Sequence, residues 1–323
     1  MNSKFLFWLL ATVFLITASA QAQQPQKVYR IGILRSDTAA SANQQIEIFT
    51  QSLRELGYIE RKNVLFERRF AEGILERLPA LAADLVQQNL DVILVNNTPP
   101  AVAAKKATDT IPIVFTVVAD PIGNGLAASL PRPGSNVTGT TNISIELTGK
   151  RLQLLKEAFP KTSRLAIFNS SQSALQLAEV QRAAKAVGIE TLPLELLRRD
   201  DFEAQFTLLR NSRANSMYPL DNPINFNLRD LLVEFAVRYR LPVIFGSRPY
   251  AESGGLMSYG ADLIANYRRA ATFVDKILKG ARPAELPIEQ PKKFEFVINL
   301  NTAKQIGFTI PLTVLAQADK VIR

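Results

Sequence analysis

Val28-Tyr29-Arg30-Ile31-Gly32-Ile33-Leu34 is an apolar run of strand length near the start of the chain. Polar residues 35–37 follow, and apolar residues then recur at helical spacing: Ile46, Phe49, Leu53 and Leu56. Gly57 comes next as a helix C-cap, because glycine readily adopts the left-handed conformation in which many helices end. A strand followed by an amphipathic helix is the repeating unit of a parallel α/β sheet.

The same alternation continues along the chain. It predicts further strands over 64–70, 91–95 and 112–118, and then a second series over 164–168, 189–194, 216–218 and 242–246. Helical spacing of apolar residues separates these strands. We therefore predict an α/β fold of two similar doubly wound halves.

The seam between the halves is predicted in the Gly-, Thr- and Asn-rich stretch 136–145, after the loop 131–134. A late helix over 263–278 and a late strand over 294–300 would return to the first and second halves respectively. The expected N-terminal lobe is 28–142 plus about 260–285, and the expected C-terminal lobe is 143–259 plus about 286–323.

The first 22 residues have the composition of an export signal. Lys4 is a positive n-region, residues 5–16 form an apolar stretch too short to span a bilayer, and Ala20-Gln21-Ala22 is a small-x-small cleavage site. We expect cleavage near Ala22 and a periplasmic location. No cysteine follows that could carry a lipid, so we expect no lipid anchor.

Composition removes several classes of chemistry. The chain has no histidine and no cysteine, which excludes Ser-His-Asp triads, thiol nucleophiles and the common zinc motifs. The net charge of +9 comes from dispersed basic residues without interleaved aromatic ones, so we predict no nucleic-acid partner. Gly123-Asn124-Gly125 resembles the start of a dinucleotide motif, but nearby prolines interrupt the unit, and we predict no cofactor and no metal.

Candidate site residues follow from topology, because ligands of open parallel sheets bind at the carboxyl ends of the strands. In the first half this rule selects Arg35, Ser36, Asp37, residues 96–98 and Asp120. In the second half it selects Asn169, Ser170, Asp221, Asn222, Ser247 and Arg248. Such polar residues either hold a ligand between the halves or cap helices.

Asp120 and Asp221 each follow a strand of a different half. The two carboxylates could hold the ammonium group of a ligand, or they could form the acid/base pair of a hydrolase. Arg35 and Arg248 could pair with a ligand carboxylate or with a neighbouring acid. We favour the binding interpretation and expect no enzymatic activity, because no other catalytic element accompanies the acids.

Several stretches resemble a known family. They are Leu53-Arg54-Glu55-Leu56-Gly57-Tyr58, Ile111-Pro112-Ile113-Val114-Phe115, Asn136-Val137-Thr138-Gly139, Gly254-Gly255-Leu256-Met257-Ser258-Tyr259-Gly260 and Gln290-Pro291-Lys292-Lys293-Phe294-Glu295. From about Tyr29 onward the chain resembles ABC-transporter substrate-binding proteins with the type I periplasmic-binding fold, which include a tryptophan-binding branch.

The resemblance implies two doubly wound, Rossmann-like lobes joined by a hinge, which close over a small organic solute such as an aromatic amino acid or an organic acid. It also implies an ABC-importer permease as the partner and a monomeric receptor. It implies ligand contacts from Thr98 and the 115–120 stretch, including Phe115 and Asp120, in the first lobe. In the second lobe it implies contacts from Asn169, Asp221 and the 247–250 loop, including Ser247, Arg248 and Tyr250. Ser36 is a further candidate ligand contact, because it follows the carboxyl end of the first predicted strand. A sensing module that presents its solute to a membrane receptor would have the same lobes and stays an alternative.

Overall fold

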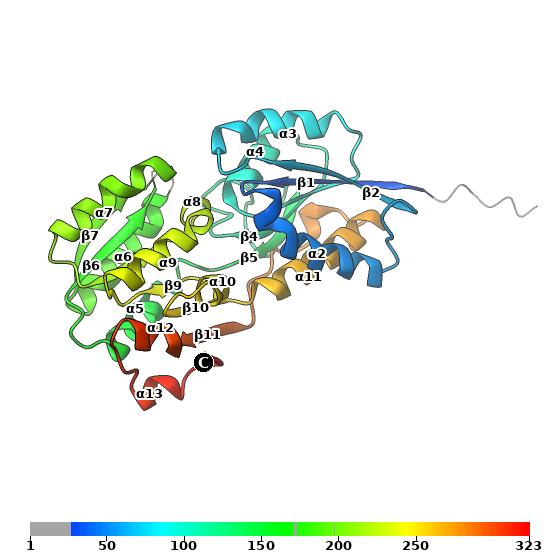
Figure 1. The fold of residues 1–323 in the computed structure, drawn as a ribbon. Helices are drawn as coiled ribbons and strands as arrows, with labels where there is room; N and C mark the ends of the chain where they lie inside the picture. Colours follow the sequence, from blue (N-terminus) through cyan, green and yellow to red (C-terminus); the bar gives the residue numbers. More distant parts are fainter. Residues whose placement is uncertain (1–26, 171–172, 197) are drawn as a thin grey trace, which may run out of the picture.

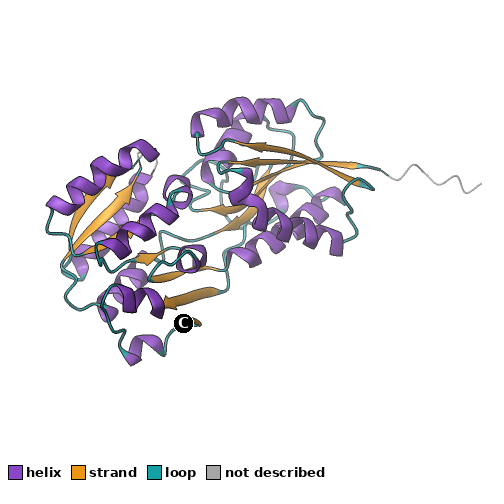
Figure 2. Ribbon diagram, in the orientation of Figure 1, coloured by secondary structure: helices purple, strands orange, loops and turns teal. Residues whose placement is uncertain are grey.

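The computed structural model describes residues 27–170, 173–196 and 198–323. Two groups of strands lie side by side, each flanked by helices (Figures 1 and 2). The first group is a five-stranded parallel sheet of order β2-β1-β3-β4-β5. Its strands are β1 (Tyr29–Arg35), β2 (Val64–Phe70), β3 (Val92–Val95), β4 (Ile113–Val118) and β5 (Val137–Thr141).

Helices cover both faces of this sheet because alternate side chains of each strand point to opposite faces. On one face α2 (Ala39–Glu55) and α11 (Leu263–Leu278) pack on a core that includes Ile31 and Ile33. On the other face α3 (Leu78–Val86) and α4 (Thr98–Ala107) pack on a core that includes Phe115. The short helices η1 (Leu75–Arg77) and η4 (Pro283–Glu285) lie in connecting segments. This sheet and its helices are called the first lobe below.

The second lobe contains a three-stranded sheet of order β7-β6-β8 and a four-stranded sheet of order β12-β11-β10-β9. An isolated bridge between Met217 and Val243 joins them, and among the strand pairs of the described residues in this lobe only β10–β11 is antiparallel. The strands are β6 (Arg164–Asn169), β7 (Glu190–Glu195), β8 (Ser216–Pro219), β9 (Ile244–Phe245), β10 (Met257–Ala261), β11 (Phe294–Asn299) and β12 (Lys320–Ile322).

One continuous hydrophobic core joins the strands of the second lobe to the helices around them. The helices are α5 (Thr148–Ala158), α6 (Ala174–Ala186), η3 (Arg199–Asp201), α7 (Phe202–Asn211), α8 (Pro223–Asn227), α9 (Arg229–Arg238), α10 (Arg248–Glu252), α12 (Leu300–Gln305) and α13 (Leu312–Leu315). In Figure 1, α8 lies on the side of this lobe that faces the first lobe.

The stretch 136–145, where the seam between the halves is predicted, begins with a strand. Residues Val137–Thr141 form β5, a fully buried edge strand of the first sheet. The stretch holds β-branched residues that suit a strand, and Gly139 is required there because a Cβ would overlap the carbonyl oxygen of Phe115 on β4. Glycine content therefore marks a close approach of two strands here.

The chain passes between the lobes after β5, between β10 and α11, and between η4 and β11. Glu289, in the segment between η4 and β11, contacts residues of β5 and of α11. Its N–H donates to Gly139 O at 2.9 Å, its carbonyl accepts from Thr141 N at 2.9 Å, and its carboxylate pairs with Arg269 at 2.5 Å. The cleft between the lobes is thus bordered by crossings that are hydrogen-bonded to one another. The predicted export signal lies outside the described residues.

Candidate functional site

A cleft between the two lobes contains two connected chambers. The inner chamber encloses about 780 Å³ of empty space, part of it open to solvent. The first lobe lines it with Arg35, Ser36, Asp37, Asn96, Asn97 and Tyr267, and the second lobe with Arg151, Asp221, Phe226, Gly246, Ser247 and Tyr250. Charges of both signs and aromatic rings therefore surround a single small space.

The outer chamber is larger, at about 1630 Å³ including open solvent. Its walls come from η1, α3 and α4 of the first lobe and from α6 and α8 of the second. Six residues line both chambers: Asn97, Val117, Asn142, Asp221, Asn222 and Pro223. The chambers are therefore continuous, and Asp221 lies at their junction.

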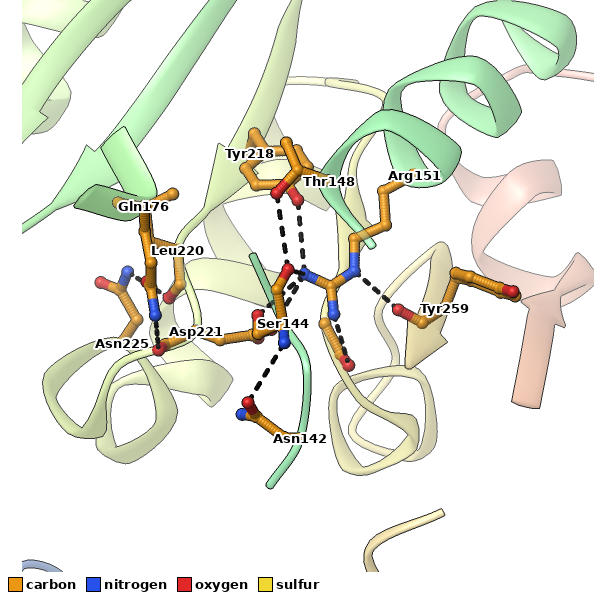
Figure 3. Close-up of polar contacts among 11 residues, drawn as sticks. Asn142, Ser144, Thr148, Arg151, Gln176, Tyr218, Leu220, Asp221, Asn225 and Tyr259 are labelled. Atoms are coloured by element: carbon orange, nitrogen blue, oxygen red, sulfur yellow. Dashed lines mark hydrogen bonds and ion pairs between the residues drawn. The ribbon is translucent and has the colours of Figure 1, made fainter. Parts of the chain in front are cut away.

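Asp221 follows β8 and is held by a buried arginine (Figure 3). Arg151 Nη1 lies 2.9 Å from Asp221 Oδ2, and the hydroxyl of Ser144 donates to the same oxygen. None of the hydrogen bonds or ion pairs found among the described residues involves Asp221 Oδ1. Because 15% of the side chain is exposed and Asp221 lines both chambers, its carboxylate is accessible to a donor in the cleft.

Arg151, on α5, is 3% exposed and joins four parts of the second lobe (Figure 3). Its Nε donates to Tyr259 O at 2.7 Å, its Nη2 donates to Gly246 O at 3.3 Å, and its Nη1 donates to Tyr218 OH at 3.4 Å. Burial alone would lower the pKa of Arg151, but Asp221 and Tyr218 outweigh burial and raise it. The guanidinium is therefore a permanent charge that fixes the position of Asp221.

Gly246 follows β9 and lies directly beside Asp221. A Cβ at this position would overlap the carboxylate of Asp221, so only glycine leaves room for the carboxylate as it lies. The inner chamber thus depends on a missing side chain as well as on the side chains present.

Arg35 and Asp37 form a second buried pair, on the first lobe. Arg35 Nε donates to Asp37 Oδ1 at 2.8 Å and Nη2 to Oδ2 at 2.6 Å, while Nη1 donates to Tyr267 OH at 2.9 Å. Burial alone would lower the pKa of Arg35, and its interactions with Tyr267 and Asp37 raise it. Both carboxylate oxygens are occupied, so this pair is saturated.

Aromatic rings form the remaining wall of the inner chamber. Tyr250 is 2% exposed, stacks on Phe245 at 4.5 Å between ring centroids, and meets Phe226 edge-on at 5.8 Å. Burial, followed by the nearby charge of Asp221, raises the pKa of Tyr250 well above its usual value. The ring is therefore a neutral, apolar surface over the useful pH range.

The structure brings most of the predicted site residues to the cleft. Ser36, Ser247 and Tyr250 line the inner chamber, Thr98 and Asp120 line the outer chamber, and Asp221 lines both. Ser36 Oγ accepts a hydrogen bond from Asn97 Nδ2 at 2.9 Å, which joins the ends of β1 and β3.

Three predicted residues lie elsewhere. Phe115 is fully buried in the core under α3 and α4 and lines neither chamber, whereas Val117, within the register shift of β4 between Phe115 and Val118, lines both. Asn169 is 8% exposed and lines neither chamber. Arg248 pairs with Glu252 at 2.7 Å and Glu295 at 3.7 Å, outside both chambers.

The two acids considered for hydrolysis are both engaged within the protein. Asp120 lines the outer chamber, but its Oδ1 accepts from Gly123 N at 2.8 Å within its own turn. Asp221 is paired with Arg151. Each of the two carboxylates is therefore held by a partner within its own lobe.

Sequence reasoning missed Arg151, Asn142, Phe226 and Tyr267 as cleft residues. A signal for Arg151 is present in the sequence. It lies three residues after Thr148 and four before Leu155, on the face that α5 buries, and a charged residue on such a face needs a buried partner. Tyr267 had no local signal because α11 reaches the first lobe from far along the chain.

Neither a metal site nor a membrane span is found in the described part of the chain. No three acidic residues there are grouped as metal ligands, and none of the helices there is long and apolar enough to cross a bilayer.

A family model described as ABC transporter substrate binding protein matches residues 30–322. The chain belongs to this family. The fold and the two-lobed cleft agree with the match, and the family's members bind small solutes for ABC transporters. The chain is accordingly an ABC-transporter substrate-binding protein.

Known relatives agree with this assignment. A tyrosine-binding protein of Clostridioides difficile is 27% identical over 285 residues, which cover 87% of this chain and 81% of that protein. A conserved domain protein of Vibrio cholerae has a TM-score of 0.86 at 28% identity, over 91% of this chain and 100% of that one. An ABC domain from Streptococcus pneumoniae, in complex with L-Trp, has a TM-score of 0.84 at 24% identity, over 92% of this chain and 100% of that one. These likenesses confirm the predicted type I periplasmic-binding fold of this substrate-binding protein.

Proposed function

We propose that this substrate-binding protein is an exported, monomeric receptor that captures an α-amino acid with an aromatic side chain and delivers it to the permease of an ABC importer. The signal peptide, removed near Ala22, would place it in the periplasm. The observation that carries the ligand class is the free carboxylate oxygen of Asp221 between an aromatic chamber and an open polar one.

Asp221 supplies the site for the ligand's ammonium group. A charge-assisted hydrogen bond from an ammonium to a partly buried carboxylate is stronger than a neutral one. Arg151 and Ser144 hold Oδ2, so that Oδ1 is oriented before the ligand arrives. Such preorganisation avoids the cost of ordering a mobile side chain on binding.

At the start of α4, Thr98 supplies its backbone N–H and its hydroxyl group for the ligand's carboxylate, since Pro99 and Pro100 have no N–H. Asn97, the N-cap residue, gives no side-chain hydrogen bond to the helix and instead donates to Ser36. The helix dipole favours an anion at this end. Thr98 lines only the outer chamber, so the carboxylate would lie on the outer side of Asp221.

The inner chamber would receive the side chain. Tyr250, Phe226 and Tyr267 present ring faces or edges against which an aromatic ligand can pack. The relatives that bind tyrosine and L-Trp support the same ligand class. An aromatic amino acid would thereby place each of its three groups on a different surface of the cleft.

Closure would follow from contacts with both lobes. The lobes 28–142 plus about 260–285 and 143–259 plus about 286–323 would move as units. A ligand that touches Thr98 and Asp221 together binds the closed state better than the open state and shifts the population toward closure. The permease would then recognise the closed form. No bond is made or broken.

A thermal-shift and calorimetry panel tests this proposal on the mature chain, stripped of carried ligand by refolding. L-tyrosine, L-tryptophan and L-phenylalanine should raise Tm, since a ligand at 100 times Kd stabilises by about 2.7 kcal/mol. N-acetyl-tyrosine, whose amine is blocked, should not. Asp221→Asn should lose binding, whereas exposed Asp109→Asn should keep it. Mass spectrometry should recover the ligand unchanged.

The outcome against the proposal is equally specific. Equal binding of tyrosine and N-acetyl-tyrosine would remove the role of Asp221. Turnover of any ligand would contradict a pure receptor, and loss of binding in both Asp variants would point to a general effect on folding.

A further inference from the structure

We propose that the ligand extends beyond a single amino acid: the outer chamber receives a carboxyl-side extension, and this receptor takes short peptides with an aromatic first residue. The inference rests on the proposed function, because it uses Asp221 as the ammonium site. It adds a second subsite, formed by α3 and α4 of the first lobe and α6 and α8 of the second.

The position of Asp221 sets the direction of the ligand. Because Asp221 lines both chambers, a ligand amine bound there has one chamber on each side. The α-carbon next to that amine carries a side chain and a carboxyl group. With the side chain in the aromatic inner chamber, the carboxyl group points into the outer chamber.

The outer chamber is larger than a free carboxylate requires. It encloses about 1630 Å³ including open solvent, against about 780 Å³ for the inner chamber. Its walls carry apolar side chains from both lobes, among them Leu78, Pro79, Val102, Ile145 and Ile224. Small hydrated anions leave such walls in contact with water, whereas the side chain of a second residue would cover them.

A cation at the far end of the chamber completes the subsite. Lys106 lines the outer chamber and lies eight residues beyond Thr98 on α4, which is about 12 Å along the helix. Lys106 forms no ion pair with any described residue, whereas its neighbour Lys105 is paired with Asp109. Because each extended residue spans about 3.5 Å and a lysine side chain is long, a dipeptide or tripeptide carboxylate can meet Lys106.

Two further acidic side chains of the outer chamber, Asp120 and Glu76, form no ion pair with Lys106 in the described part of the chain. Asp120 is turned onto its own loop by Gly123, and Glu76 lies on η1. A peptide amide without a terminal charge would gain nothing from Lys106. The carboxylate of the last residue is therefore the group that this subsite distinguishes.

Calorimetry on the mature protein tests the proposal with tyrosine, tyrosyl-leucine and tyrosyl-leucine amide, and with the tryptophan series. We expect each dipeptide acid to bind at least tenfold tighter than the free amino acid and the amide. Lys106→Ala should weaken the dipeptide acid about tenfold and leave the amino acid unchanged. Lys105→Ala is the matched control and should change neither.

A second pair of variants tests the space itself. Val102→Trp fills the outer chamber and should weaken the dipeptide but not the amino acid, while Val28→Trp, outside both chambers, should do neither. Free amino acids that bind as tightly as dipeptides would overturn the extension and leave the proposed function intact. A protein that binds neither amino acids nor dipeptides would contradict both.

Discussion

The two buried arginine–carboxylate pairs of the cleft look alike but are built differently. Arg35 and Asp37 are two residues apart and share both carboxylate oxygens through a bidentate contact. Arg151 and Asp221 come from distant parts of the second lobe, and only one carboxylate oxygen is occupied. The first pair is 2% and 4% exposed at its side chains and the second 3% and 15%. Arg35–Asp37 therefore serves the fold alone, whereas Arg151–Asp221 leaves one carboxylate oxygen for a ligand.

The largest expected effect is the loss of folding stability when the Arg35–Asp37 pair is broken. Asp37→Ala would leave the Arg35 guanidinium buried with Tyr267 as its remaining side-chain partner, and breaking a buried pair on one side costs about 3–5 kcal/mol of folding free energy. Urea unfolding should show this loss. The double variant Arg35→Met/Asp37→Leu should recover most of it, because no unpaired charge remains. A single variant as stable as the native protein would show that the pair contributes little.

Breaking the Arg151–Asp221 pair should weaken ligand binding more than it lowers folding stability. In Asp221→Asn, Arg151 keeps the carbonyl groups of Tyr259 and Gly246, so the loss of folding stability should be smaller than for Asp37→Ala. Loss of a charge-assisted hydrogen bond of about 1.5–3 kcal/mol should weaken ligand binding about 10- to 100-fold. Calorimetry and urea unfolding of the same samples measure both. The opposite order of effects would reverse the roles assigned to the two pairs.

A substitution at Gly246 should disturb the Arg151–Asp221 pair without removing either of its charges. Gly246→Ala adds a methyl group where the Asp221 carboxylate lies, so the carboxylate must shift and ligand affinity should fall about tenfold, worth about 1.4 kcal/mol. Gly149→Ala is the control. It lies on α5 with no neighbour near the added carbon, and it should slightly stabilise the helix without changing affinity. Equal affinity in the two variants would contradict the close approach at Gly246.

Elements and site residues that depend on local sequence were predicted correctly more often than those that depend on contacts distant in the sequence. Strand and helix periodicity is local, and the helix expected over 263–278 is found at those residues as α11. Ser36, Asp221 and Ser247 were found because the carboxyl ends of parallel strands share one edge. Arg151 and Tyr267 were not, since each reaches the cleft from a helix whose neighbours are set by the tertiary fold. Phe115 was misplaced because the irregular register of β4 between Phe115 and Val118, which the sequence does not reveal, brings Val117 to the cleft and leaves Phe115 in the core.

The smallest expected effect lies at alkaline pH. Burial raises the pKa of Tyr250 in the folded state, while the unfolded residue titrates near pH 10. The stability that this ring contributes is therefore complete below about pH 10 and is lost as pH rises toward the folded-state pKa. Over that range each such tyrosine lowers the unfolding free energy by about 1.4 kcal/mol per pH unit. Buried Tyr218, whose pKa burial also raises, adds to the same slope.

Tyr250→Phe removes one titrating group without removing a hydrogen bond recorded among the described residues, so its unfolding free energy should fall less steeply above pH 10 than that of the native protein. Tyr239→Phe, at a residue that is 37% exposed, is the control and should leave the slope unchanged. Urea unfolding at several pH values between 9 and about 11 measures the slopes. An unchanged slope in Tyr250→Phe would mean that the ring reaches solvent in the native state, and the inner chamber would then be wetter than its aromatic wall implies.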